Sequence, residues 1–124
     1  MIFFLTVKQV IAIHDYQIKT YGGLAGYRNI GLIEGMVARV ENLHVYQAEN
    51  DLFVLAASML LSIARGHGFN DANKRTAAAS AMVFLDMNNV SIAPSEGFAD
   101  YVVEAAQGLH DVHDVALTLQ KLIN

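Results

Sequence analysis

The chain has 124 residues, of which 54% are hydrophobic, and it carries no cysteine. This length suits one domain over residues 1–124, and the apolar fraction is enough for a core, which excludes a disordered chain. The formal net charge is −4 without any run of lysine or arginine, so we expect no direct binding of nucleic acid. The absence of cysteine excludes disulfides and thiolate metal sites and suits the cytoplasm. The apolar start, cut short by Lys8, is too brief for a signal peptide or a membrane span.

Capping and turn residues mark the first two helices. Thr6 to Gln9 fit a capping box, and the helix that follows should run to about Thr20, where Gly22-Gly23 ends it. A second helix carries one apolar stripe, formed by Ile30, Ile33, Met36, Val37 and Val40. Residues 43–50 lack this period, and we expect them to be irregular or briefly extended.

Two strongly apolar helices come next. Asp51 is placed as the N-cap of a third helix, and Gly66 is a suitable C′ residue at its end. The fourth helix, over residues 76–87, is apolar almost all round, which is typical of a helix buried at the centre of a domain. Asn88 and Asn89 suit its end.

Two shorter helices complete the predicted fold. Pro94-Ser95 should open a fifth helix that extends to about Gln107. Asp111 should cap a sixth, in which apolar residues recur at 3.6-residue spacing. The sequence therefore predicts an all-α protein, a compact bundle of about six helices.

The polar segment His67-Gly68-Phe69-Asn70-Asp71-Ala72-Asn73-Lys74-Arg75-Thr76 separates the two most apolar helices. It places two cations at a helix N-terminus, where the macrodipole favours anions instead. Unpaired N–H groups in a first helical turn also bind anions readily. We therefore expect Asn73, Lys74 and Arg75 to neutralise phosphate charge at this point.

Two further side chains of the segment have the chemistry of phosphoryl transfer. His67 is a candidate general base, because a neutral imidazole accepts protons near neutral pH; the alternative is an ordinary loop histidine. Asp71 is a candidate ligand of Mg²⁺, which prefers one carboxylate together with substrate phosphates and waters. Asp71 could equally cap the fourth helix, as could Asn70. Phe69 is expected to anchor the loop by packing.

The same segment resembles the Fic/Doc superfamily, and specifically its Doc branch, the death-on-curing toxins. The broad Fic pattern reads H-x-F-x-[DE]-G-N-G-R-x-x-R, and it is matched here by His67, Phe69, Asp71, Asn73 and Arg75. Ala72 and Lys74 replace its glycines and Ala78 replaces its second arginine, and these departures are similar to the Doc motif. Other segments look Doc-like in order and spacing: 4–6, 13–15, 21–23, 31–34 and 51–53.

This resemblance implies the Fic fold and a function. A Doc-like protein would bind ATP and Mg²⁺ with the γ-phosphoryl group facing His67 and would transfer that group to a protein hydroxyl. The implied target is elongation factor Tu, whose modification arrests translation. The implied inhibitor is a Phd-type antitoxin, so the chain would be the toxin of a toxin–antitoxin pair.

Other readings stay open on the sequence alone. The broad Fic activity is transfer of AMP, which depends on the second arginine that is Ala78 here. An HD-type metal-dependent phosphohydrolase would use the pairs His14-Asp15, His110-Asp111 or His113-Asp114. A non-catalytic relative that retains only the antitoxin contact is a further alternative. Residues 43–50 are either a flap that aligns a target peptide by strand addition or a plain connection.

Overall fold

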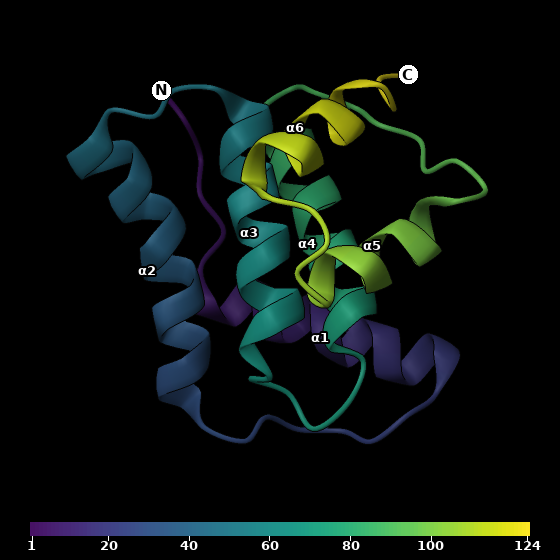
Figure 1. Ribbon diagram of the computed structural model, residues 1–124. Helices are drawn as coiled ribbons and strands as arrows, with labels where there is room; N and C mark the ends of the chain where they lie inside the picture. Colours follow the sequence, from purple (N-terminus) through teal and green to yellow (C-terminus); the bar gives the residue numbers. More distant parts are fainter.

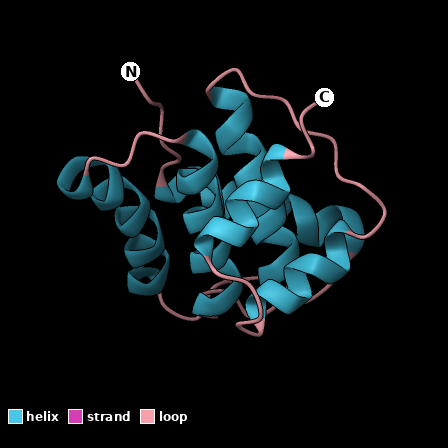
Figure 2. Ribbon diagram, turned by 45° about the horizontal axis from the view of Figure 1, so that its top comes forward, coloured by secondary structure: helices cyan, strands magenta, loops and turns pink.

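The computed structural model describes residues 1–124 and consists of helices joined by loops (Figures 1 and 2). The six helices are α1 (Val7–Tyr21), α2 (Ile30–Gln47), α3 (Leu52–Gly66), α4 (Asn73–Met87), α5 (Phe98–Ala106) and α6 (Val112–Gln120). The only extended pairing is two isolated bridges, Tyr27 with Phe69 and Ile92 with Ile123. The predicted all-α fold is therefore confirmed. None of the helices is both long and apolar enough to cross a membrane.

The predicted caps set several of the helix ends. Thr6 and Gln9 form a reciprocal capping box at the start of α1, and Gly22, with φ 85°, terminates that helix. Asp51 accepts a hydrogen bond from the Phe53 N–H at the start of α3. Asp111 caps α6 in the same way through the N–H of Asp114. Short polar side chains therefore fix these ends as the sequence indicated.

Residues 43–50 were predicted to be irregular or extended, and this prediction is wrong for residues 43–47, which are helical, and correct for residues 48–50. Helix α2 continues to Gln47, and only Ala48, in the left-handed conformation with φ 55°, ends it. The helix is prolonged by half-buried Leu43, which extends the apolar stripe, and by His44, whose ring packs against Phe4. A strand-adding flap cannot form from a segment that is largely helical.

The helix at the centre of the bundle is α3, not α4 as its apolar sequence suggested. Helix α3 packs against α2, α4, α5 and α6, and nearly all of its side chains after Leu55 are buried (Figure 1). Helix α4 packs on α1, α3 and α5 and leaves one apolar side uncovered. That side carries Ala78, Ala79, Met82 and Val83, which line an open cavity.

Two predicted helix boundaries were also wrong. The left-handed residue that ends α3 is His67, with φ 49°, and Gly66 is still helical. Helix α5 begins at Phe98 rather than at Pro94-Ser95. The Ala93 N–H donates to the Leu122 carbonyl, so this stretch pairs with the C-terminal end and cannot turn helical earlier.

Asn88 ties the N-terminal segment to the end of α4. Its Oδ1 accepts from the Phe3 N–H at 2.9 Å, while its Nδ2 donates to the carbonyls of Phe3 at 2.9 Å and Phe84 at 2.8 Å. One side chain thus satisfies three backbone groups, including a carbonyl in the last turn of the helix. This connection holds Phe4 against Phe84, whose ring centroids lie 5.9 Å apart.

Replacing Asn88 with alanine should destabilise the protein by about 1–3 kcal/mol, because it leaves backbone groups without partners. Urea denaturation followed by circular dichroism measures this loss. Asn50→Ala is the matched control, since Asn50 is exposed and its side chain makes no hydrogen bond. Equal unfolding free energies for the two variants would contradict the assigned role of Asn88.

Candidate functional site: the loop between α3 and α4

The loop that joins α3 to α4 begins and ends with a non-glycine residue in the left-handed conformation. His67 has φ 49° and Ala72 has φ 60°. Such residues cost free energy, and they persist where surrounding contacts hold them in place. Strained backbone of this kind clusters at functional sites, so the backbone of this loop alone marks it as a candidate site.

A second loop, residues 22–29, lies along the first and supplies those contacts. The Arg28 N–H donates to the Gly68 carbonyl at 2.8 Å, and the Asn70 N–H donates to the Gly26 carbonyl at 3.0 Å. The Asn70 side chain adds a bond from its Nδ2 to the Ala25 carbonyl at 3.0 Å. The two loops therefore form a short antiparallel pair around the Tyr27–Phe69 bridge.

The carboxylate of Asp71 is held by backbone donors from both loops. Its Oδ2 accepts from the Leu24 N–H at 2.9 Å and its Oδ1 accepts from the Ala72 N–H at 2.8 Å. Hydrogen bonds from Leu24 and then Ala72, with the nearby Arg75 guanidinium adding a smaller effect, lower the pKa of Asp71. The charged form thus stabilises the fold above the ordinary aspartate pKa, and this contribution is lost as the pH falls through the lowered value.

Neither Asp71 nor Asn70 caps α4, although both were considered as caps. The N-cap position is Ala72, and no side chain accepts a hydrogen bond from the first turn there. The reason is the left-handed backbone at Ala72, which turns the preceding side chains away from the helix axis. Asp71 is bonded instead to Leu24 and Ala72, and Asn70 to Ala25.

Phe69 and Asn73 hold the middle of the loop. The Phe69 side chain is fully buried, as a packing anchor should be. The amide side chain of Asn73 bonds both backbone groups of Phe69, accepting from its N–H and donating to its carbonyl at 3.1 Å each. The Asn73 side chain, predicted to face phosphate, is therefore engaged with the loop, and its backbone N–H is the group that remains available.

The start of α4 concentrates unpaired donors. The N–H groups of Asn73, Lys74 and Arg75 donate to no protein atom; Thr76 is the first residue of α4 whose N–H is bonded, to the Ala72 carbonyl. Lys74 is exposed and forms neither a hydrogen bond nor an ion pair. Arg75 donates to the carbonyls of Gly22 at 2.9 Å and Gln17 at 3.4 Å. No lysine or arginine in the protein lies within 4.0 Å of a carboxylate, so neither cation forms a close ion pair, although Arg75 is near enough to Asp71 to lower its pKa.

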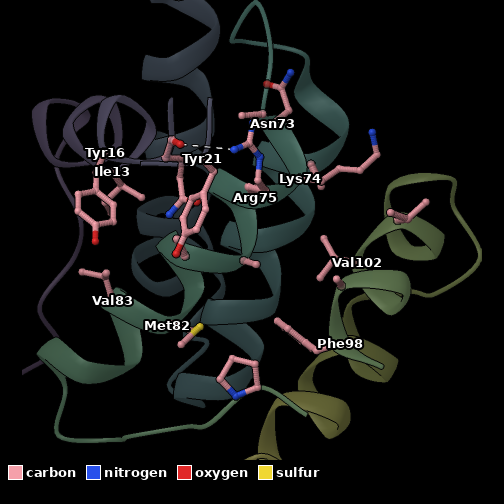
Figure 3. A pocket seen from close by; sticks show the side chains of 18 of the residues that line it. Ile13, Tyr16, Tyr21, Asn73, Lys74, Arg75, Met82, Val83, Phe98 and Val102 are labelled. Atoms are coloured by element: carbon pink, nitrogen blue, oxygen red, sulfur yellow. Dashed lines mark hydrogen bonds between the residues drawn. The ribbon is translucent and has the colours of Figure 1, made fainter. Parts of the chain in front are cut away.

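These groups border a single open cavity of about 1340 Å³ that runs between α1, α4 and α5 (Figure 3). Its polar end contains His67, Asp71, Asn73, Lys74 and Arg75, so the structure brings all five predicted polar site residues together. The opposite part is apolar and is lined by Ile13, Tyr16, Met82, Val83, Phe98 and Val102. His67 is exposed, and its ring forms no hydrogen bond within the protein.

The donor set fits a magnesium ion that arrives with a nucleotide. The lowered pKa of Asp71 keeps its carboxylate charged, and no cluster of three or more acidic, histidine or cysteine residues occurs. Mg²⁺ commonly uses one or two carboxylates and takes its remaining ligands from phosphates and water. Asp71 is therefore the residue that would hold it.

Three residues at this site were not predicted from the motif. Gly23, with φ 122°, lies so near the Asp71 carboxylate that a Cβ atom there would be 2.6 Å from Oδ2. Arg28 lines the cavity on the second loop. His14 contacts the motif loop from α1. Gly23 and His14 fall within the segments that resembled Doc proteins, which was the available signal; Arg28 carried none.

Comparison with known proteins agrees with this geometry. Residues 4–85 match the Fic/DOC family. The chain belongs to the Fic/Doc family. It is 44% identical over 118 residues to "Protein kinase doc" of Escherichia phage P1, which covers 95% of this chain and 94% of that protein. It is also 39% identical over 90 residues to "Toxin Doc" of Mycolicibacterium smegmatis, which covers 72% of this chain and 65% of that one.

The geometry gives no support to an HD-type phosphohydrolase. His14 is buried, and its Nδ1 lies 3.8 Å from the exposed carboxylate of Asp15. Asp111 and Asp114 form the capping box of α6. The His-Asp pairs of the sequence thus have separate structural roles and do not converge.

Gly23→Ala should abolish binding of ATP with Mg²⁺ at the site, because the new methyl group would displace the Asp71 carboxylate. Gly22→Ala is the matched control: its φ of 85° is also positive, yet a Cβ atom there meets nothing within 4 Å. Both changes should cost about 1–3 kcal/mol of stability through backbone strain. Isothermal titration calorimetry then separates them, since only the Gly23 variant should lose affinity. Equal affinities would show that the approach of Gly23 to Asp71 is unimportant.

Proposed function

We propose that this protein is the toxin of a toxin–antitoxin pair and an ATP-dependent protein kinase. The observation that carries the proposal is the start of α4, where three free backbone N–H groups and two cations without a close ion pair border the same cavity as an exposed histidine and a charged aspartate. Phosphoryl transfer depends on positioning and on neutralising charge, and these groups supply both. The name of the phage P1 relative, a protein kinase, agrees with this chemistry.

In the proposed reaction, His67 accepts the proton of a hydroxyl group on the target protein. The hydroxyl oxygen forms a bond to the γ-phosphorus of ATP while the bond from that phosphorus to the bridging oxygen breaks, and ADP leaves with the electron pair. Lys74, Arg75 and the free N–H groups neutralise the phosphate charge. Mg²⁺, when bound at Asp71 and the phosphates, supplies further charge neutralisation. Phe69 and Asn73 hold the loop in place.

The orientation of the nucleotide distinguishes this proposal from AMP transfer. The broad Fic motif has an arginine where Ala78 lines the cavity here, one turn of α4 beyond Lys74. Without a cation at this position, the only cations that α4 offers to the phosphates are Lys74 and Arg75 in its first turn. We therefore propose that the γ-phosphoryl group, rather than the α-phosphoryl group, faces the base. Adenylyl transfer is the second candidate, favoured only by membership of the wider family.

The proposed target is elongation factor Tu in the cytoplasm, as the Doc resemblance implies, and its phosphorylation would arrest translation. The proposed partner is a Phd-type antitoxin. The apolar part of the cavity, between α4 and α5, would accept one face of an amphipathic helix from its C-terminal segment. A disordered segment that folds on binding pays for its ordering with such apolar contacts and leaves the toxin free once it is degraded.

Incubation with labelled ATP, Mg²⁺ and purified elongation factor Tu tests the reaction. Label in the γ-position should enter the target, and label in the α-position should not. His67→Ala should lower the rate by about 10²–10⁴-fold, the usual contribution of a positioned base, and should relieve growth arrest. His113→Ala, at an exposed position on α6, should change nothing. Incorporation of the α-label would establish adenylyl transfer, and a fully active His67→Ala protein would remove His67 from the mechanism.

Val103→Asp should weaken binding of the antitoxin segment, because it places a charge on the α5 wall of the cavity. Val103 and Val45 are both exposed apolar residues, at 37% and 62%, but Val45 lies on α2 outside the cavity. Val45→Asp is therefore the control that should bind normally. Fluorescence anisotropy with a labelled peptide from the protein encoded beside this gene measures both affinities. Unchanged binding by Val103→Asp would place the antitoxin elsewhere.

A further inference from the structure

His14 is a fully buried histidine that the proposed reaction does not use. It lies on α1, with no exposed surface, at the point where that helix meets the loop between α3 and α4. Buried histidines are commonly packing residues, but this one contacts two members of the motif at once. Its contacts therefore bear on how the site is held.

Both contacts have defined geometry. The Nε2 atom lies 2.8 Å from the Asp71 carbonyl oxygen, and the ring stacks on Phe69 with centroids 3.9 Å apart and planes 9° from parallel. A carbonyl oxygen only accepts hydrogen bonds, so Nε2 must carry a proton and donate it. The other ring nitrogen, Nδ1, is buried without a hydrogen-bond partner and lies 3.8 Å from the Asp15 carboxylate, so the one hydrogen bond of the His14 side chain is to Asp71.

The Asp71 carbonyl occupies a special position relative to α4. Four residues later stands Arg75, whose N–H would bond to this carbonyl if the helix began one residue earlier. In the structure that bond is absent, Ala72 is left-handed, and the Arg75 N–H is free. His14 donates to this carbonyl instead, and the bond holds the carbonyl in the orientation that accompanies the left-handed Ala72.

We propose that His14 is a positioning residue for phosphoryl transfer. By holding the Asp71 carbonyl, it keeps the Arg75 N–H available for phosphate and fixes the peptide between Asp71 and Ala72. The same bond orients the Asp71 carboxylate, because one of its two backbone donors is the Ala72 N–H of that peptide; the other donor is the Leu24 N–H on the second loop. This inference rests on the proposed function, since it assigns His14 to that same site.

Two substitutions separate the hydrogen bond from the packing. His14→Leu keeps an apolar side chain of similar bulk and removes the donor, whereas His14→Gln retains a terminal N–H donor. Residues that orient a metal-binding carboxylate typically contribute about 10–100-fold to activity or metal affinity. We expect His14→Leu to lower kcat and the affinity for ATP with Mg²⁺ by about this factor and His14→Gln to recover most of the loss.

The control for stability is Val10→Ala, which alters another fully buried residue of α1 one turn earlier. It should lower the melting temperature at least as much as His14→Leu while leaving kcat unchanged. All variants are assayed well below their melting temperatures, determined by circular dichroism. Equal losses of kcat in Val10→Ala and His14→Leu would reduce His14 to a packing residue and overturn the proposal.

Hydrogen exchange at the Phe69 and Asn70 amides tests the inference without relying on the reaction. The Phe69 N–H donates to the Asn73 side chain and the Asn70 N–H to the Gly26 carbonyl, and both amides should exchange faster in His14→Leu than in Val10→Ala. If the parent transfers no phosphate, the proposed kinase function fails, while exchange and the calorimetric affinity still decide on His14. Parent-like exchange, affinity and kcat in a folded His14→Leu protein would overturn the proposal.

Discussion

The pairing of two loops is the constraint on which this site depends. Residues 22–29 and 67–72 exchange backbone hydrogen bonds, and the loop between α3 and α4 can keep its two left-handed residues only because residues 22–29 satisfy its polar groups. The carboxylate of Asp71 is part of this pairing, since it accepts from Leu24. If the loop between α3 and α4 were free to relax, α4 would extend into it. The N–H groups now free at the start of the helix would then no longer be available to an anion.

The charges in the first turn of α4 are opposite in sign to those that usually stabilise the start of a helix. Carboxylates commonly occupy a first helical turn, yet α4 begins with Lys74 and Arg75 and has no acidic residue there. Neither cation has an anionic partner within the protein. This arrangement favours the bound state of an anion more than the empty protein, which is how a binding site differs from a stabilising cap.

Much of the fold was predictable because its signals are local. The boundaries at Thr6, Asp51 and Asp111 follow from side chains that cap their own helices. The failures arose where distant contacts overrode local pattern. Residue 93 pairs with residue 122, and α5 begins later in the sequence than predicted. The apolar surface of α4 was predicted to lie in the core, although part of it lines a cavity.

The residues of the site likewise fall into those that the sequence could predict and those that it could not. The motif from His67 to Arg75 could be read directly, whereas its support could not, because His14, Gly23 and Arg28 meet it only in the folded chain. The N-cap of α4, left open between Asp71 and Asn70, proved to be neither residue. The left-handed backbone at Ala72 depends on the neighbouring loop and not on the residues beside it.

The separation between the two halves of the site also has a consequence during synthesis. The hydrogen bonds that join α1 and residues 22–29 to the motif span 40 to 58 residues of sequence. Contacts of this range form late, after the cost of closing a long loop of chain has been met. A growing chain on the ribosome therefore carries the complete motif before it carries a working site. The proposed antitoxin would have this interval in which to bind each new molecule.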